Sequence, residues 1–566
     1  MADSSAHAVE RALAAIDGAK LPFPDNELLE SFLQEAADPV AAARYLLQRG
    51  TSSSKAGLDM RPLLADWKAL VALFMSEAAP RPAVDKRLVA AVWKRDSGKC
   101  CLTDFKSSLL DPLLVAPIHT LQKPVPESLH VMFGAFIGAE MQQRIISHDA
   151  SLDSPGNFWL VRKSAAAAMA QGWIQIGSPL ANMLFLTVLG FSCPVRPSIL
   201  DRMPVMRRTT FANSAAPDVD APDVALMRLS SQFTKPIRWS LFAREIAARQ
   251  SPPQPLMPPR VLARQPPSLW RRAGSVAAAL CLDSWRRFVP GKLRIRLYCF
   301  LGMLGTRWYG PTSSMSVQQL PFGLYLKTTY VAQHLSLINE QAALQLVHQH
   351  TNIPVPRPLD LVSDAHMSYL LMTRAPGIRL GACIDVLGDD EAELLSRDLQ
   401  QCLDEIRSIP RQTQQENAGE GAAAAQSISI CGVLGGPLYD HRVYMGMGTT
   451  EEAQSLFKGP FENEDEFNKA LQTNALPGLA HRSGHRIVFT HGDLNMRNIL
   501  MRNGRLSAIV DWENASWCPE YWDYTKAHFV TKLKKRWLRI VDDAFRPMGN
   551  FQSELAVQKQ YWWYCC

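Results

Sequence analysis

The strongest constraint on the fold comes from one stretch near the C-terminal end, IVFTHGDLNMRNILMRNGRLSAIVDWENA, at residues 487–515. Its apolar segment Ile487–Phe489 predicts a short strand that leads into the polar loop HGDLNMRN. A second strand is expected at Ile499–Leu500, followed by an Asn–Gly turn. A third strand, Leu506–Val510, ends at Asp511. This hairpin brings the polar loop and Asp511 to neighbouring strand ends.

The polar side chains of this hairpin suit phosphoryl transfer to a hydroxyl group. That reaction needs a carboxylate to orient the acceptor and take its proton, and oxygen ligands that hold Mg²⁺ between phosphates. We expect Asp493 to be the base, with Asn498 and Asp511 as metal ligands. His491 would brace the loop through hydrogen bonds. The alternative is an Asp-rich turn with an Asn cap and no chemistry.

A second pair of charged residues upstream fits the same chemistry. The segment FGLYLKTT, residues 322–329, predicts a strand whose single positive charge is Lys327. The helix expected next, at residues 335–350, offers Glu340 as its only carboxylate. A kinase uses such a strand lysine to hold the α- and β-phosphates of ATP, oriented by a helix glutamate. An exposed lysine with an unrelated glutamate is the alternative.

The motifs of this region resemble those of one known family. HGDLNMRNIL followed by IVDWE resembles the signature of the aminoglycoside phosphotransferase and choline kinase-like family. WYGPTSSMSVQQLPFGLYLKT, IPVPRPLDLV and YLLMTRAPG resemble its fungal branch, and the likeness covers approximately residues 292–547. The resemblance implies an α+β, bilobal protein kinase-like fold, with ATP between a small β-rich lobe and a helical lobe. By matching position, Asp493 resembles the family's catalytic base, and Asn498 and Asp511 resemble its Mg²⁺ ligands.

The loop that would cover the nucleotide departs from the usual kinase pattern. No G-x-G-x-x-G precedes the strand lysine, and the equivalent loop is YGPTSSMS at residues 309–316. Its backbone amides and the hydroxyls of Ser313 and Ser314 are our candidates for phosphate contacts. The resemblance implies that backbone near Met372 and Thr373 meets the adenine edge. Because the Gly-rich loop is missing, a catalytically weak pseudokinase that serves as a nucleotide sensor or scaffold stays open.

The N-terminal half carries weaker signals. Residues 1–85 show helical periodicity, and residues 86–178 change from a basic helix into a small α+β unit. WKRDSGKCCLT in this second unit resembles the opening of HNH nuclease-like domains. However, its histidine, His119, lies two residues from the usual place, and Cys100 and Cys101 are adjacent rather than spaced as in a zinc knuckle. We expect a degenerate structural module, with a nucleic-acid-processing protein as the remaining alternative.

The composition changes again in the middle of the chain. Proline-dense segments predict a linker region at residues 179–291, and folded patterning resumes in the kinase-like domain at residues 292–548. The last segment, residues 549–566, is expected to be a tail. It ends in Cys565 and Cys566, a pair that is lipidated in some protein contexts.

The overall composition is that of an ordinary globular protein. Hydrophobic residues make up 47% and charged residues 20%, and 60 Lys and Arg against 53 Asp and Glu give a net charge of +7. This charge is too dilute for a nucleic-acid-binding coat. The longest apolar run, residues 180–191, is shorter than the roughly 20 residues of a membrane span. The 11 cysteines follow no regular spacing. We therefore expect a cytoplasmic protein with reduced thiols and no membrane span.

The sequence thus predicts an ATP- and Mg²⁺-dependent phosphotransferase that acts on a hydroxyl of a small molecule. The identity of this acceptor and any protein partner stay open. Acidic residues that follow the metal aspartate are candidates for holding an amine-bearing alcohol: Glu513, Glu520 and Asp523. Alternatively, these acids are surface groups, and Asp523 braces the catalytic loop.

Overall fold

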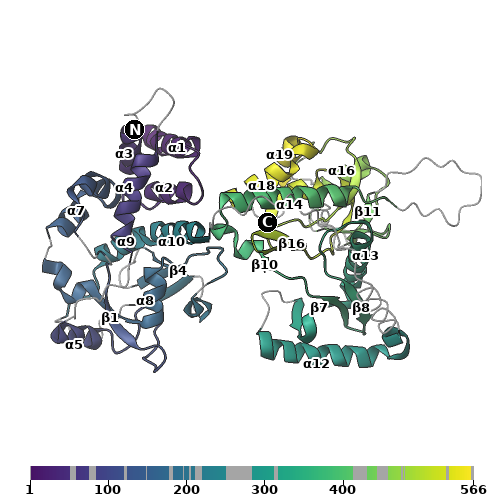
Figure 1. The fold of residues 1–566 in the computed structure, drawn as a ribbon, viewed down its shortest axis with the longest axis horizontal. Coiled ribbons are helices and arrows are strands. Elements are labelled where there is room, and N and C mark those ends of the chain that lie inside the picture. Colours follow the sequence, from purple (N-terminus) through teal and green to yellow (C-terminus); the bar gives the residue numbers. More distant parts are fainter. Residues whose placement is uncertain are drawn as a thin grey trace, which may run out of the picture. The chain divides into compact units, whose positions relative to one another are not determined.

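The computed structural model divides the chain into two compact units, with elements labelled as in Figure 1. The N-terminal unit comprises Met1–Pro253 and the short segment Asp385–Asp389. The C-terminal unit comprises Gln254–Ile384 and Asp390–Cys566. The structure describes the whole chain except residues 1, 51–58, 76–84, 120, 122–123, 148–149, 178–182, 196, 203–205, 211–218, 250–283, 311–315, 412–429, 441, 443–456, 473–475, 477, 531–533 and 562–566.

Helices form the first part of the N-terminal unit, where the sequence shows helical periodicity. They are α1 (Ala2–Gly18), α2 (Asp25–Gln34), α3 (Pro39–Gly50), α4 (Arg61–Ala72), α5 (Lys86–Arg95), α6 (His130–Ile137) and α7 (Ala139–Ile146). Aromatic rings join α2, α4 and α6 in one core. The Phe32 ring centroid lies 5.0 Å from that of Trp67 and 5.6 Å from that of Phe136. Phe136 in turn lies 5.1 Å from Phe233, so residues far apart in sequence share this core.

Small antiparallel sheets complete the described part of this unit. One pairs β1 (Leu113–Pro117) with β2 (Phe158–Arg162), and the other has the order β3 (Ile174–Ile176), β4 (Met183–Val188), β5 (Met206–Thr210). The buried guanidinium of Arg95 stabilises this region through hydrogen bonds. It donates hydrogen bonds to the carbonyls of Pro155, Phe158 and Asp220 at 2.8, 2.6 and 3.0 Å. A fully buried charge needs such partners to offset its desolvation.

The linker predicted at residues 179–291 is in part a folded region. Helices α9 (Val224–Gln232) and α10 (Thr234–Arg249) bury Met227 and Phe242 in the N-terminal unit. The Asp223 carboxylate caps α9 by accepting hydrogen bonds from the backbone amides of Ala225 and Leu226. The sequence did not predict these helices, because the flanking prolines favour an extended linker. Residues 250–283, which include the most proline-dense segment, lie outside the described residues.

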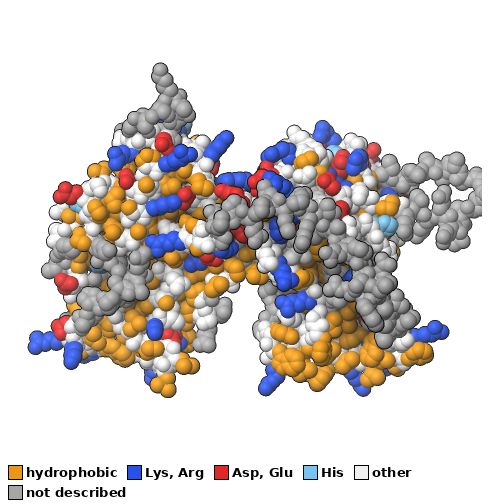
Figure 2. Space-filling view, viewed as in Figure 1, with side chains coloured by type: hydrophobic (Ala, Val, Ile, Leu, Met, Phe, Trp, Pro, Cys, Tyr) orange, Lys and Arg blue, Asp and Glu red, His pale blue; other side chains and the backbone are white. Residues whose placement is uncertain are grey.

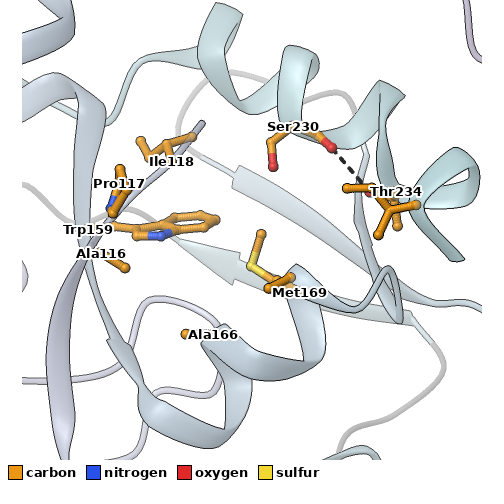
Figure 3. Close-up of a pocket in the computed structure, with 10 residues that line it drawn as sticks. Ala116, Pro117, Ile118, Trp159, Ala166, Met169, Ser230 and Thr234 are labelled. Atoms are coloured by element: carbon orange, nitrogen blue, oxygen red, sulfur yellow. Dashed lines mark hydrogen bonds between the residues drawn. The ribbon is translucent and has the colours of Figure 1, made fainter. Parts of the chain in front are cut away.

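A small pocket in the N-terminal unit is lined mainly by apolar side chains (Figure 3). Ile118 follows β1, Trp159 comes from β2, and Met169 comes from α8 (Lys163–Ala170). The Thr234 hydroxyl at its edge donates a hydrogen bond to the Ser230 carbonyl at 3.3 Å. None of the lining residues is ionisable. The pocket therefore offers no acid, base or metal ligand.

The C-terminal unit begins with a four-stranded antiparallel sheet that carries a helix on each face. Its order is β6 (Val317–Leu320), β7 (Leu324–Tyr330), β9 (Met367–Thr373), β8 (Pro358–Ser363). Leu337 of α13 (His334–His350) packs with Leu370. Ile295 of α12 (Gly291–Tyr309) belongs to the cluster that contains Leu371. Neighbouring strand residues face opposite sides of a sheet, so the two helices lie on opposite faces.

The rest of this unit is mostly helical, with short strands. The helices are α14 (Asp389–Arg407), α16 (Glu464–Leu471), α17 (Trp522–Val530), α18 (Lys535–Phe545) and α19 (Gln552–Tyr561). The strands are β10 (Ile378–Arg379), β11 (Cys431–Gly432), β12 (Leu438–Tyr439), β13 (Phe457–Lys458), β14 (Ile487–Thr490), β15 (Ile499–Arg502), β16 (Arg505–Ile509) and β17 (Ser516–Pro519). The predicted hairpin is confirmed as β15–β16, because Ile499 pairs with Ile509. Asn503 and Gly504 at its turn both have positive φ, as a tight hairpin requires.

The C-terminal segment is more ordered than the predicted tail. Helix α19 buries Leu555 and Tyr561, and the Tyr561 hydroxyl donates a hydrogen bond to the Leu479 carbonyl at 2.6 Å. Cys565 and Cys566 lie outside the described residues. Within the described parts of the chain, no helix combines the length and the apolarity that crossing a membrane requires.

A buried histidine beside α19 makes the stability of this unit depend on pH. Burial lowers the pKa of His481 to about 4, and its Nε2 contacts Gln558 Oε1 at 3.1 Å. The unfolded chain, with a pKa of about 6.5, binds this proton more readily, so stability is complete above about pH 6.5 and is lost as pH falls toward 4. Between pH 7 and pH 5 we expect a loss of about 2 kcal/mol from this group. Urea unfolding of His481→Gln should show this pH dependence reduced, while the exposed control His366→Gln should match the wild type. Equal slopes in all three proteins would contradict the assignment.

Candidate active site

The loop between β14 and β15 is held by a network of buried hydrogen bonds. The backbone amides of His491 and Gly492 donate to the two carboxylate oxygens of Asp523 at 3.0 and 2.8 Å. Gly492 has a φ of 77°, and a Cβ there would lie 2.1 Å from the Asn514 carbonyl oxygen. Only glycine fits such a position. Asp523 therefore braces the loop, which is one of the roles that the sequence analysis left open for it.

His491 fixes the orientation of the loop, as expected from the sequence. Its ring is fully buried, and Nε2 lies 3.0 Å from the Val510 carbonyl oxygen, which can only accept. Nε2 thus carries the proton, and Nδ1 accepts the hydrogen bond from the Asp493 amide at 3.2 Å. His491 is therefore a positioning residue that connects the loop to Val510, which follows β16.

The Asp493 carboxylate lies between an amide and a lysine. Its Oδ2 accepts a hydrogen bond from Asn498 Nδ2 at 2.9 Å, and its backbone carbonyl accepts another from the same nitrogen at 2.8 Å. On the other side, Lys526 Nζ lies 3.3 Å from Asp493 Oδ1. The side chain of Asp493 is 25% exposed. It is therefore fixed in direction and still open to a second molecule.

Lys526 is the site residue that the sequence analysis missed. It lies on α17, 33 residues after Asp493 in sequence, and its side chain is 1% exposed. Burial lowers its pKa, and the charge of Arg442 adds to this, whereas Asp440 and Asp493 raise it. The contact depends on how α17 packs against the loop, and no local sequence motif predicts it. The segment WDYTKAHFV does contain a single lysine, which is the one available hint.

Lys327 forms ion pairs with three carboxylates. Its ammonium group lies 2.9 Å from Glu340 Oε2 and 3.0 Å from Glu513 Oε2, and it also pairs with Asp511 Oδ1. The predicted pairing of strand lysine and helix glutamate is therefore formed. Lys327 is buried on β7, and Glu340 is buried on α13. Asp511 of the hairpin and Lys327 of the sheet are therefore in contact although they lie 184 residues apart in the sequence.

The charges of this cluster shift one another's pKa values. Burial alone would lower the pKa of Lys327, but the three carboxylates raise it well above its usual value. Burial raises the pKa of Glu340 to about 7, against the opposing pull of Lys327. Burial also tends to raise the pKa of Asp511, yet the Lys327 charge and hydrogen bond bring it below its ordinary value. Such displaced values in one cluster are typical of functional sites.

The hairpin end at Asp511 is strained in the way that active sites often are. Asp511 has a φ of 69°, in the left-handed region that non-glycine residues rarely adopt. The next residue, Trp512, is buried and donates its backbone amide to Glu340 Oε1 at 3.3 Å. This contact ties the position of Asp511 to α13. Like Trp512, the neighbouring Trp517 and Trp522 are buried, so they serve packing.

The donor set fits a divalent cation of the magnesium type. Asp511 and Asn498 offer carboxylate and amide oxygens, which are hard ligands. The Asn498 carbonyl accepts the amide of Val510 at 2.9 Å. The two candidate ligands therefore lie at the same end of the hairpin, where Asn498 precedes β15 and Asp511 follows β16. Because Asn498 Nδ2 is taken by Asp493, its Oδ1 is the atom left for a metal. Carboxylate oxygens of Glu340, Asp511 and Glu513 also lie within 4.8 Å of one another, which would add to the negative field.

Other predicted contacts are less well supported. Ser313 and Ser314 lie outside the described residues. Met372 and Thr373 lie at the end of β9, but the Thr373 amide already donates to the Arg357 carbonyl at 3.0 Å. The Arg374 amide donates to the carbonyl of Gly323, the residue before β7, at 2.8 Å. Adenine recognition at this place would therefore rely on carbonyl groups or on rearranged amides.

Comparison with known proteins agrees with this geometry. Residues 327–553 match the phosphotransferase enzyme family. The match begins at Lys327 itself and contains Asp493, Asn498 and Asp511, and it spans about two fifths of the chain. A search of curated proteins gives no match. The fungal affiliation and the HNH-like resemblance stay predictions.

Solved structures of aminoglycoside phosphotransferases are among the matches in structure. The GDP complex of a mutant aminoglycoside 2′-phosphotransferase IIIa is 15% identical, with a TM-score of 0.31, and the match covers 47% of this chain and 86% of that one. An aminoglycoside phosphotransferase from Streptomyces rimosus in complex with ADP and streptomycin is 14% identical, with a TM-score of 0.30, covering 48% and 98%. We base the functional proposal on the family match and the side-chain contacts.

The nuclease-like segment offers no comparable constellation. Burial raises the pKa of the Cys101 thiol well above its usual value, which favours its protonated form. His130 Nε2 is engaged by the Val125 carbonyl at 2.9 Å. Within the described residues, no group of metal-binding spacing includes these side chains.

Proposed function

We propose that the C-terminal unit transfers the γ-phosphate of ATP, with Mg²⁺, to a hydroxyl group of a small molecule. The observation that carries the proposal is the convergence of two sets of residues in one unit. Lys327 contacts Glu340 and Asp511, while Asp493 is held by Asn498 beside the same strand ends. Phosphoryl transfer depends almost entirely on positioning and charge stabilisation, and these residues supply both.

Each residue has a role in this reaction. Lys327, oriented by Glu340, binds the phosphates. Asp511 and Asn498 would hold Mg²⁺, which supplies positive charge to the phosphate oxygens when bound. Asp493 orients the acceptor hydroxyl and takes its proton at a carboxylate whose direction is fixed by Asn498 and Lys526.

The acids that were candidates for binding an amine-bearing acceptor have internal partners. Glu513 pairs with Lys327, and Asp523 accepts the two loop amides. Glu520 lies 3.6 Å from the Arg486 guanidinium. We therefore base no amine preference on these acids, and the acceptor class is the part of the proposal that needs a screen.

An acceptor screen tests the reaction directly. ADP formation from Mg-ATP should rise above the water background with at least one class of alcohol among sugars, amino sugars and amino alcohols. Asp390→Asn, at an exposed position on α14, serves as the control and should match the wild type. Binding of Mg-ATP without turnover in any class would favour the pseudokinase, whose support is the missing Gly-rich loop at residues 309–316.

Replacing Lys526 tests whether the buried cation positions the base. Lys526→Met keeps the chain length and removes the charge beside Asp493, so the carboxylate loses one of its two side-chain anchors. We expect kcat to fall about 10- to 100-fold, with less than a twofold change in the KM for Mg-ATP. Lys559→Met, at an exposed position on α19, should leave kcat unchanged. A purely structural role would instead lower the amount of folded protein and leave kcat per folded molecule intact.

A further inference from the structure

Helix α12 presents an exposed apolar face on the C-terminal unit. Phe300, Met303 and Trp308 are 51%, 67% and 61% exposed, and Leu293 and Leu297 are also exposed. The preceding Phe288 is 76% exposed. Figure 2 displays hydrophobic side chains gathered over the α12 end of this unit, with Lys and Arg side chains at the edges. Large exposed apolar patches mark interaction sites.

The rotation of α12 about its axis is fixed, so this exposure is built into the fold. On its inner face, Arg294 makes two hydrogen bonds to the buried Asp360 carboxylate at 2.6 and 2.7 Å. Tyr298 donates to the same carboxylate at 2.6 Å. Gly302 and Gly305 allow the helix to approach β6, since a Cβ at Gly305 would lie 1.9 Å from the Gln319 carbonyl oxygen. Any rotation that hid the outer apolar face would break these contacts.

The same segment is positively charged and contains no acid in its own sequence. No Asp or Glu occurs in residues 284–339, whereas α12 alone carries Lys292, Arg296 and Arg307 at exposed positions. The adjacent Arg287 is exposed as well. A helix that combines exposed Leu, Phe and Trp with Lys and Arg fits the interface of an anionic bilayer. There the apolar side chains enter the acyl boundary and the cations meet lipid phosphates.

Other occupants fit this face less well. A second copy of the chain would bring two basic α12 faces together, and like charges repel. A nucleic acid would use the basic residues, but it gives no partner to exposed Leu297, Phe300 and Met303. We propose that the outer face of α12 docks the protein on a membrane surface that contains anionic lipid. The family match begins at Lys327, so α12 lies outside it, and this inference is independent of the proposed catalysis.

Vesicle sedimentation of the full chain tests the inference. The wild type should pellet with phosphatidylserine-containing vesicles and at least about tenfold less with pure phosphatidylcholine vesicles. Leu297→Ser with Phe300→Ser, and separately Arg296→Glu with Arg307→Glu, should each lower binding fivefold or more. Leu434→Ser and Arg397→Glu, at exposed positions elsewhere in the unit, are the matched controls and should bind like the wild type. High salt should weaken wild-type binding.

Several results would overturn the inference. One is no pelleting of the wild type, and another is equal pelleting with both lipids. Unchanged binding of the α12 variants would assign any binding to another surface. A wild-type dimer in light scattering that becomes monomeric in the Leu297→Ser, Phe300→Ser variant would make a second copy the occupant. Circular dichroism should show equal helicity in all variants, because the changed side chains are exposed.

Discussion

Asp493→Asn should abolish phosphate transfer while leaving Mg-ATP bound. The substitution keeps the shape of the side chain and its contact with Asn498, which can be preserved by a rotated amide, but removes the group that takes the acceptor proton. General base catalysis contributes about a hundred- to ten-thousand-fold, so we expect kcat to fall by that factor. The ATP affinity should change less than about twofold, because Lys327, the proposed phosphate ligand, pairs with Glu340, Asp511 and Glu513 rather than with Asp493 in the described contacts.

The control for this prediction is Asp390→Asn, which changes an exposed acid of the same unit. Turnover is measured as ADP formation with the best acceptor of the screen, and affinity by displacement of a fluorescent ATP analogue. Equal turnover in Asp493→Asn and the wild type would remove Asp493 from the reaction. A loss of both turnover and nucleotide binding would instead indicate that the loop has collapsed.

Asp511→Asn should remove the stabilisation that Mg-ATP gives to the folded protein. Asp511 pairs with Lys327 and follows β16, the strand that is paired with β15 beside Asn498. A ligand at about 100 times its Kd stabilises the native state by about 2.7 kcal/mol. We therefore expect the unfolding temperature of the wild type to rise with Mg-ATP and that of Asp511→Asn to stay constant.

The matched control is Glu393→Gln on α14, whose exposed side chain pairs only with Arg397 in the described contacts. Its unfolding temperature should respond to Mg-ATP as the wild type does. Thermal unfolding with ATP alone and with Mg²⁺ alone separates the metal contribution from that of the nucleotide. A full response of Asp511→Asn to Mg-ATP would place the metal elsewhere.

The candidate site was predictable where its residues lie in short, regular patterns. The spacing of Asp493, Asn498 and Asp511 on a strand–loop–hairpin segment predicted their proximity, because an Asn–Gly turn joins adjacent antiparallel strands. The exact register was not predictable, since it shifts by one residue between Leu500 and Met501. The pairing of Lys327 with Glu340 was predictable from a strand and the helix that follows it. The hairpin contacts depend on local geometry, whereas the Lys327–Glu340 pair was predicted from the kinase pattern of a strand lysine and a helix glutamate.

Contacts that depend on the packing of distant elements were not predictable. Lys526 reaches Asp493 only because α17 packs behind the loop, and the hydrogen bonds of Thr373 depend on the register between neighbouring strands. The sequence left Glu513 as a candidate for binding an amine-bearing acceptor. In the structure it pairs with Lys327 instead. The linker prediction failed at α9 and α10, where proline-rich flanks outweighed the apolar periodicity of two short helices.

Calorimetric titration of the full chain with Mg-ATP tests the central claim most directly. We expect saturable binding with one nucleotide per chain, which weakens strongly when Mg²⁺ is withheld and is lost in Asp511→Asn. Absence of binding to the folded wild type would contradict the account. The arrangement of Lys327, Asp493 and Asp511 would then be an inherited scaffold without a nucleotide.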